Sequence, residues 1–129
     1  ARNLTILLVD DNKDNRTVIS AYFRKTEHKV ETALNGEEAV TRIKQGCYDL
    51  VLMDMEMPVM DGYTAVRLLR DWELETGRTP LPIIALTANA LKEDHRRSLE
   101  AGCTDHLTKP IRKEKLLEVV SKYAGNYGE

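Results

Sequence analysis

Residues 4–9 of the chain read Leu-Thr-Ile-Leu-Leu-Val, and two similar runs follow, Leu-Val-Leu-Met at 50–53 and Ile-Ile-Ala-Leu at 83–86. Each run is short, continuous and rich in branched apolar residues. Such runs are typical of central strands that a parallel sheet buries on both faces. The sequence therefore predicts three central strands at these positions, and two weaker strands at 30–33 and 104–107.

Amphipathic helices are expected between the strands, because apolar residues recur there at helical spacing. The apolar positions are Val18, Ile19, Tyr22 and Phe23; Ala39, Val40 and Ile43; Val66, Leu69 and Trp72; and Leu116, Leu117, Val119 and Val120. We expect these side chains to form the inner faces of the helices.

Helix ends are marked by residues that commonly cap helices. Asn35, followed three residues later by Glu38, resembles a capping box, and Asp61-Gly62 favours a helix start. We expect helices to end at Gly46, Gly102 and Gly125. The pattern is thus five repeats of a strand followed by a helix.

Strands that alternate with helices imply a parallel sheet, because parallel neighbours need a crossover connection. Right-handed crossovers place helices on both faces. The predicted fold is a doubly wound α/β domain with a five-stranded parallel sheet, one domain over residues 1–129 with its core at about 4–123. Ligands of such sheets bind beyond the carboxyl ends of the strands, so residues there are the functional candidates.

Charge and composition exclude several classes of function. The net charge of −2 and a pI near 6.0 argue against nucleic-acid binding. Since no apolar run approaches the roughly 20 residues that cross a bilayer, we expect a cytoplasmic domain without membrane contact. Cys47 and Cys103 form no metal-spaced motif and are expected to be buried. Whether the chain, which begins at Ala1, is part of a longer protein stays open, as does its oligomeric state.

Polar residues with compatible chemistry follow the predicted strands. Asp10 and Asp11 follow the first strand, Asp54 the third, Thr87 the fourth, and Lys109 lies just past the fifth. Carboxylates gathered at one edge repel one another, and a hard divalent cation such as Mg²⁺ relieves the repulsion. With a metal present, these groups suit phosphoryl transfer: Asp54 as the nucleophile, Lys109 as a cation and Thr87 as a hydroxyl donor.

Ordinary structural roles are the alternative for each residue alone. Asp10 or Asp11 could cap a helix, Asp54 could be a loop acid, and Thr87 could cap the fourth helix. The four methionines, Met53, Met55, Met57 and Met60, are expected to pack in the core or loops rather than to bind a soft metal. His28 and His95 have no second ligand at metal spacing and are interpreted as surface or packing residues.

Four segments resemble the signature blocks of response-regulator receiver domains, in the order of that family and over nearly the whole chain. They are Leu8-Val9-Asp10-Asp11-Asn12, the run from Asp54 to Gly62 (Asp-Met-Glu-Met-Pro-Val-Met-Asp-Gly), Ile83-Ile84-Ala85-Leu86-Thr87-Ala88 and Leu107-Thr108-Lys109-Pro110. The resemblance implies a flavodoxin-like (βα)5 fold with strand order 2-1-3-4-5.

The resemblance also implies roles for single residues around a Mg²⁺ cofactor. Asp54 is the phosphoacceptor, and Asp11 is a direct Mg²⁺ ligand. Asp10 acts largely through metal-bound water, and Glu56 offers its backbone carbonyl to the metal.

Further implied roles concern the switch that follows phosphorylation. Thr87 is the switch hydroxyl, Lys109 is the ion-pair partner of the phosphoryl group, and the Lys109-Pro110 bond is cis. The signal would pass through the face formed by the fourth helix, fifth strand and fifth helix.

Two features depart from the family pattern or fall on its variable positions. His106 stands where the family usually has tyrosine or phenylalanine, so we expect the coupling of this ring to phosphorylation to be weaker or pH-sensitive, and we hypothesise that the ring still swings inward as Thr87 moves. Glu56 and Asn89 are two residues after Asp54 and Thr87, where side chains can overhang the aspartyl phosphate. We expect both to tune its hydrolysis.

The tracts at 85–90 and 100–111 resemble receivers of hybrid sensor kinases. This predicts a histidine kinase or a histidine phosphotransfer domain as partner. The alternative functions are a small aspartyl-phosphate phosphatase, a flavodoxin-like cofactor carrier, and a receiver-like module that binds partners without phosphorylation. The nucleophile candidate in mid-chain argues against the first. The missing Gly-rich phosphate loop argues against the second, and the complete acceptor set argues against the third.

Overall fold

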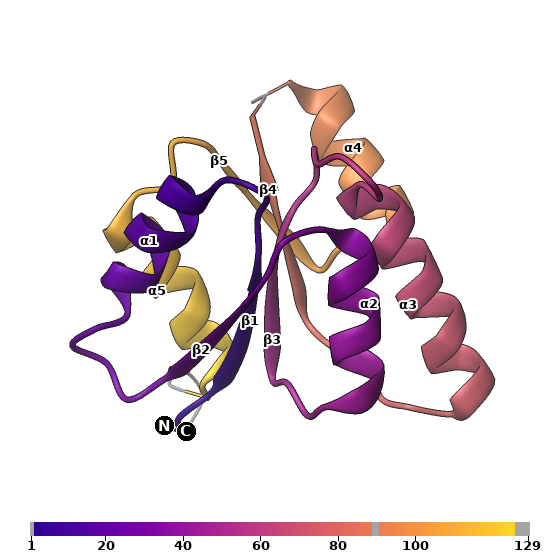
Figure 1. Cartoon of the computed structure of the whole chain (residues 1–129), viewed down its shortest axis with the longest axis horizontal. Helices are drawn as coiled ribbons and strands as arrows, with labels where there is room; N and C mark the ends of the chain where they lie inside the picture. The colour runs from indigo at the N-terminus through magenta and orange to yellow at the C-terminus, as the bar shows by residue number, and fades with distance from the viewer. Residues whose placement is uncertain (1, 89–90, 126–129) are drawn as a thin grey trace.

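The computed structural model describes residues 2–88 and 91–125, and within them five strands alternate with five helices (Figure 1). The strands are β1 (Thr5–Val9), β2 (Lys29–Ala33), β3 (Leu50–Asp54), β4 (Ile83–Thr87) and β5 (Asp105–Thr108). The helices are α1 (Lys13–Tyr22), α2 (Gly36–Gln45), α3 (Gly62–Thr76), α4 (Lys92–Ala101) and α5 (Lys113–Tyr123).

All strand pairs are parallel, and the sheet order is β2-β1-β3-β4-β5. The predicted fold class and strand order are confirmed. β3, β4 and β5 each end one residue later than predicted, so Asp54 and Thr87 are the last residues of β3 and β4 rather than the residues that follow them. Both side chains are therefore held by a rigid central strand.

The helices form one layer on each side of the sheet: α1 and α5 cover one face, and α2, α3 and α4 cover the other (Figure 1). Alternate residues of β1 serve the two layers, as the pleat requires. Leu7 and Val9 pack with the α2–α4 layer, whereas Ile6 and Leu8 pack with the α1 and α5 layer. Every residue of β3 and β4 is buried, which explains why their sequences are continuous apolar runs.

Capping residues fix several helix ends. The Asn35 side chain accepts a hydrogen bond from the Glu38 N–H at 2.8 Å, and Asp61 accepts one from the Thr64 N–H at 2.8 Å. α4 ends at Gly102 as predicted, with φ of 115°. α2 ends at Gly46 without a left-handed residue, and α5 ends one residue before Ala124, so Gly125 lies beyond its cap. The left-handed cap of α3, Gly77, was not predicted.

Two predictions of burial are wrong. Val18 is 49% exposed, because it lies on the outer side of α1, and Cys47 is exposed in the loop between α2 and β3. Cys103 is buried as predicted. The methionine prediction is confirmed, since Met53, Met55 and Met57 are buried and Met60 packs against the same core.

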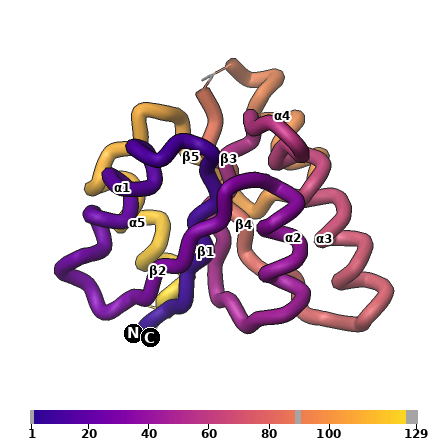
Figure 2. The backbone as a smooth tube through the Cα atoms, in the orientation of Figure 1, coloured from indigo at the N-terminus to yellow at the C-terminus, as the bar shows by residue number. Residues whose placement is uncertain are grey.

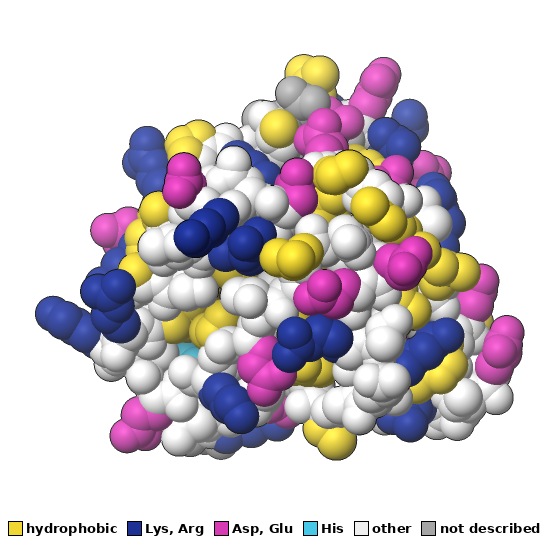
Figure 3. Space-filling model, in the orientation of Figure 1, with side chains coloured by type: hydrophobic (Ala, Val, Ile, Leu, Met, Phe, Trp, Pro, Cys, Tyr) yellow, Lys and Arg dark blue, Asp and Glu magenta, His cyan; other side chains and the backbone are white. Residues whose placement is uncertain are grey.

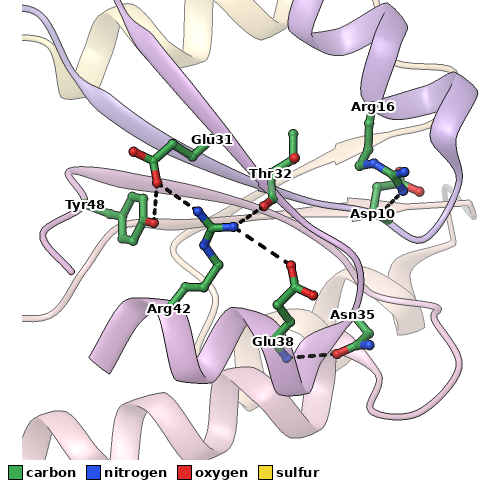
Figure 4. A network of polar contacts seen from close by, with 8 residues as sticks. All are labelled: Asp10, Arg16, Glu31, Thr32, Asn35, Glu38, Arg42 and Tyr48. Atoms are coloured by element: carbon green, nitrogen blue, oxygen red, sulfur yellow. Dashed lines mark hydrogen bonds and ion pairs between the residues drawn. The ribbon is translucent and has the colours of Figure 1, made fainter. Parts of the chain in front are cut away.

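The edge strand β2 is tied to α2 by a polar network (Figure 4). Arg42 donates hydrogen bonds to the Thr32 carbonyl at 2.8 Å and to Glu31 at 3.1 Å, and Tyr48 donates to the same Glu31 oxygen at 2.8 Å. The Tyr48 hydrogen bond, aided by Lys29 and Arg42, lowers the pKa of Glu31. Charged and polar side chains, rather than apolar ones, thus fix the edge strand β2 to α2.

Basic and acidic side chains alternate over the face that Figure 3 shows.

The two ends of the described chain lie side by side (Figure 2), where the Arg2 N–H donates to the Ala124 carbonyl at 2.9 Å. No helix in the described ranges is long and apolar enough to cross a bilayer.

Candidate functional site

The carboxyl ends of the strands, at the top of the sheet in Figure 1, bring the predicted site residues together. Asp10 follows β1, Asp54 ends β3, Thr87 ends β4, and Lys109 follows β5. These positions are up to 99 residues apart in the sequence, and the parallel sheet places them at one edge.

Three carboxylates form the centre of the site. Asp10, Asp11 and Asp54 each contribute an oxygen, and these oxygens all lie within 4.8 Å of one another. Asp10 is fully buried and Asp54 is 3% exposed, whereas Asp11 is exposed to solvent. The cluster therefore has a buried base and an open side.

Lys109 is the cation of the site. Its Nζ lies 3.2 Å from Asp54 Oδ1 and 3.6 Å from Asp10 Oδ2. Its backbone N–H donates to the Thr87 carbonyl at 2.7 Å, which fixes the start of the Lys109 side chain beside the end of β4. The peptide bond between Lys109 and Pro110 is cis.

Burial dominates the electrostatics of Asp54. Burial and, to a smaller extent, the nearby Asp10 raise the pKa of this carboxyl from 3.8 to about 6, against the opposing effects of the Glu56 N–H and the Lys109 charge. The Glu56 N–H donates to Asp54 Oδ1 at 3.1 Å. One lysine thus does not fully compensate two buried carboxylates.

The donor set fits a divalent cation. Asp10 Oδ1 accepts the Asn12 N–H at 2.9 Å, but the buried Oδ2 has no hydrogen-bond partner among the described residues. A buried carboxylate oxygen without a hydrogen bond is costly, unless an ion occupies the space beside it. Oxygen ligands from several carboxylates next to open solvent are what Mg²⁺ takes in proteins.

The comparison with protein families decides the identity. The model of the response regulator receiver domain matches residues 6–121 of the chain. The chain is a member of the receiver-domain family. It is thus a signalling domain of two-component and phosphorelay systems.

Curated relatives of this receiver domain include much longer histidine kinases. The sensor histidine kinase GacS of Pseudomonas protegens is 42% identical over 120 residues, which are 93% of this chain and 13% of that protein. The hybrid signal transduction histidine kinase M of Dictyostelium discoideum is 44% identical over 123 residues, which are 94% of this chain and 5% of that protein. The chain therefore spans only a small part of these relatives.

Solved structures agree with the fold. The receiver domain of the sensor histidine kinase PA1611 from Pseudomonas aeruginosa, solved with a magnesium ion coordinated in its active-site cleft, is 41% identical with a TM-score of 0.84, over 95% of this chain and 98% of that one. The receiver domain of Ssk1 from Saccharomyces cerevisiae, crystallised with the histidine phosphotransfer protein Ypd1, is 33% identical with a TM-score of 0.92, over 95% of this chain and 90% of that one.

The structural alternatives for single residues do not hold in this receiver domain. Asn12, not Asp10 or Asp11, caps α1 by accepting the Asn15 N–H at 3.0 Å. The N-cap of α4 is Leu91, so Thr87 is not its cap. Asp54 belongs to a strand rather than to a loop.

The two predicted rate-tuning residues are in different situations. The Glu56 side chain is exposed and accepts a hydrogen bond from the Ala88 N–H at 3.4 Å, so it reaches from the end of β3 to the end of β4. Asn89 lies outside the described residues.

Sequence reasoning missed two features next to the site. Arg16 donates to the Asp10 carbonyl at 2.9 Å and so ties the first turns of α1 to the acidic loop (Figure 4). Its position one turn into the helix after Asp10-Asp11 was the available signal. The second feature is a contact between His95 and His106, whose rings lie 3.7 Å apart. Nothing in the spacing of two residues on different elements indicates such a contact.

Proposed function

We propose that this receiver domain accepts a phosphoryl group onto Asp54 from a phosphohistidine donor and changes conformation in response. The observation that carries the proposal is a nearly buried carboxylate, Asp54, held 3.2 Å from Lys109 and within reach of two further acids. A buried carboxylate beside a fixed cation is arranged for attack on a group that carries negative charge.

The reaction is a displacement at phosphorus. An oxygen of ionised Asp54 forms the new P–O bond, while the P–N bond of the donor breaks and its electron pair returns to the imidazole, which takes up a proton. Lys109 neutralises negative charge on the phosphoryl oxygens, and the Thr87 hydroxyl donates to one of them after transfer. Hydrolysis of the aspartyl phosphate returns the domain slowly to its starting state.

Mg²⁺ would be held by Asp10, Asp11 and Asp54 with the backbone carbonyl of Glu56, Asp10 acting largely through metal-bound water. Bound there, the ion supplies charge neutralisation for the phosphoryl oxygens. The exposed Asp11 gives the site its open side, and the Oδ2 of Asp10, which has no hydrogen bond within the described residues, gives it a buried acceptor.

The switch joins the site to the α4–β5–α5 face. The Lys109 N–H bonded to the Thr87 carbonyl couples the ends of β4 and β5, and His106 lies three residues before Lys109. Movement of Thr87 toward the phosphoryl group would draw the His106 ring inward and reshape that face. Glu56, through its bond to the Ala88 N–H, and Asn89 tune the lifetime of the phosphate.

The partner is a histidine kinase or a histidine phosphotransfer domain, and the domain acts in the cytoplasm. A hollow beside the site is lined by Val18, Tyr22, Pro110 and Ile111, and Tyr22 donates to the Ile111 carbonyl at 2.9 Å. Docking of the donor there would cover the exposed Val18 and bring a phosphohistidine next to Asp54. The co-crystal of Ypd1 with the receiver domain of Ssk1 supports a partner of this kind.

The deciding experiment is transfer of labelled phosphate from a panel of phosphorylated histidine kinases and phosphotransfer domains, with Mg²⁺ and with EDTA. We expect acid-labile, hydroxylamine-sensitive label on the wild type with Mg²⁺ and none on Asp54→Asn. The exposed acid Asp14 provides the matched control, Asp14→Asn, which should be labelled normally. Unchanged label on Asp54→Asn would refute the assignment. Rapid multiple turnover of a phosphomonoester would indicate a phosphatase, and tight donor binding without label would indicate a binding module.

A further inference from the structure

Two imidazole rings lie against each other between α4 and β5. The ring centroids of His95, on α4, and His106, on β5, are 3.7 Å apart, and the ring planes differ by 30°. Leu107 packs with the α1 and α5 layer, so strand alternation directs its neighbour His106 to the other face, toward α4. The ring contact therefore joins a helix to the edge strand of the sheet.

The contact holds a part of α4 that has little other anchorage. The buried residues of α4 are Ser98 and Ala101, both in its second half. Its N-cap, Leu91, makes no side-chain capping bond, and Leu91 itself is 65% exposed. His95 lies one turn from the start of the helix, where its ring is the group that reaches β5.

The surroundings disfavour a charged His106 ring. His95 Nε2 is buried and has no hydrogen-bond partner within 2–88 and 91–125, so a proton added there would find no acceptor. Burial lowers the pKa of His106, and the neighbouring His95 lowers it further, while Asp105 acts in the opposite direction. Protonation of either ring thus works against the contact.

Charged groups next to the two rings belong to β5, α5 and α4. On β5, the Asp105 carboxylate accepts a hydrogen bond from the backbone N–H of His106 at 2.8 Å. Arg112 and Lys115, before and within α5, line the same hollow as His106. The β4 residue opposite His106 is Ala85, which has no charge.

On α4, Asp94 and Arg96 flank His95 in the sequence, one of each sign.

We propose that His95 and His106 form a proton-sensitive contact, the histidine latch, which holds the first half of α4 against β5 while both rings are neutral and releases it when they are charged. His95 acts as a positioning residue for His106. The latch operates in the unphosphorylated chain, so it goes beyond the phosphoryl transfer proposed above and does not depend on it.

Amide hydrogen exchange of the unphosphorylated protein, measured at pH 7.5 and 5.5, tests the latch. Protection factors of α4 amides, which correct for the intrinsic rate, should fall at least tenfold in the wild type at pH 5.5 while those of α2 do not change. His95→Phe and His106→Phe keep two stacked rings and remove one titrating group. Each should abolish the drop.

His28 stays in every variant, so titration of that residue cannot account for a difference between them. His95→Ala removes the contact altogether and should lower α4 protection at both pH values. Should the wild type show no drop, or should both phenylalanine variants show the same drop, the latch is wrong. If His95→Phe does not fold, His106→Phe decides by itself.

Discussion

The ammonium of Lys109 lies 3.2 Å from Oδ1 of Asp54. Asp54 ends the buried strand β3, and Lys109 precedes the cis peptide bond that follows β5. The same ammonium is 3.6 Å from Asp10 Oδ2. One cation thus serves two buried carboxylates, and burial, aided by the charge of Asp10, raises the pKa of Asp54 to about 6 in spite of the ion pair.

Replacement of this cation is expected to impair acceptance of phosphate. In Lys109→Ala, two carboxylates are left without their ammonium, so the pKa of Asp54 should rise above about 6. Phosphorylation by a fixed donor should slow at least about tenfold, since charge stabilisation of a transferring phosphoryl group is lost. Carboxyl-carbon NMR titration and labelling rates measure the two effects. Lys113→Ala, at an exposed position of α5, is the matched control and should behave as the wild type.

Stability without metal should depend on pH through Asp54. Because the folded pKa, about 6, lies above the unfolded value near 3.8, the folded state binds more protons between these values, and stability falls as pH rises through that window. A difference of this size corresponds to about 3 kcal/mol in the free energy of unfolding. Asp54→Asn lacks the titration. Its stability relative to the wild type in EDTA should therefore increase from pH 4 to pH 7, as urea unfolding at each pH would show.

Equal differences in unfolding free energy at the two pH values would contradict this prediction. Subtraction of the two proteins removes contributions from other titrating groups, such as His28, whose pKa is lowered by burial.

Much of the fold was predictable because the central strands are buried on both faces. β1, β3 and β4 are recognisable in the sequence as continuous apolar runs. Because helices separate the strands along the chain, only a few sheet topologies are compatible with the sequence. The edge strand β2 is only partly buried, with the pattern Lys-Val-Glu-Thr-Ala, so its signal is weak. The burial of Val18 was predicted wrongly because helical spacing alone does not separate the inner face of α1 from the edge of that face, which is exposed.

The candidate site was predictable in composition but not in detail. Strand ends converge in any parallel sheet, so Asp10, Asp54 and Lys109 could be placed together from the sequence. Contacts between side chains of separate helices and loops leave no such trace. The pairing of His95 with His106 depends on where α4 settles, which is fixed by packing rather than by a local pattern.

Gly62 supports the site by its lack of a side chain. A Cβ there would lie 2.6 Å from the Asp54 carbonyl oxygen and 2.7 Å from Met55 Sδ. Gly62→Ala should therefore cost about 1–3 kcal/mol of stability and displace Asp54, with slower phosphorylation as a result. Gly77→Ala is the comparison: nothing lies within 4 Å of its added Cβ, and only the φ of 68° opposes it.

We expect Gly77→Ala to lose about 1 kcal/mol and to retain phosphorylation. Urea unfolding and labelling rates on both variants distinguish crowding at the site from backbone strain. Normal labelling of Gly62→Ala would show that the end of β3 tolerates the displacement.

Mg²⁺ should stabilise the folded chain through the three acids. Binding to the folded state alone adds RT ln(1 + [Mg²⁺]/Kd), about 2.7 kcal/mol at a hundred times Kd. The melting temperature of the wild type should therefore rise with Mg²⁺ and return on chelation. Asp10→Asn and Asp11→Asn should each weaken the response, but the two variants should differ without metal. Asp10 is buried, its Oδ2 has no hydrogen bond within the described residues, and it shares the Lys109 ammonium with Asp54, so neutralisation of Asp10 should raise the metal-free melting temperature. Asp11 is exposed, so Asp11→Asn should leave the metal-free melting temperature nearly unchanged. Thermal unfolding in EDTA and in Mg²⁺ measures both effects, and an undiminished Mg²⁺ response in both variants would place the ion elsewhere.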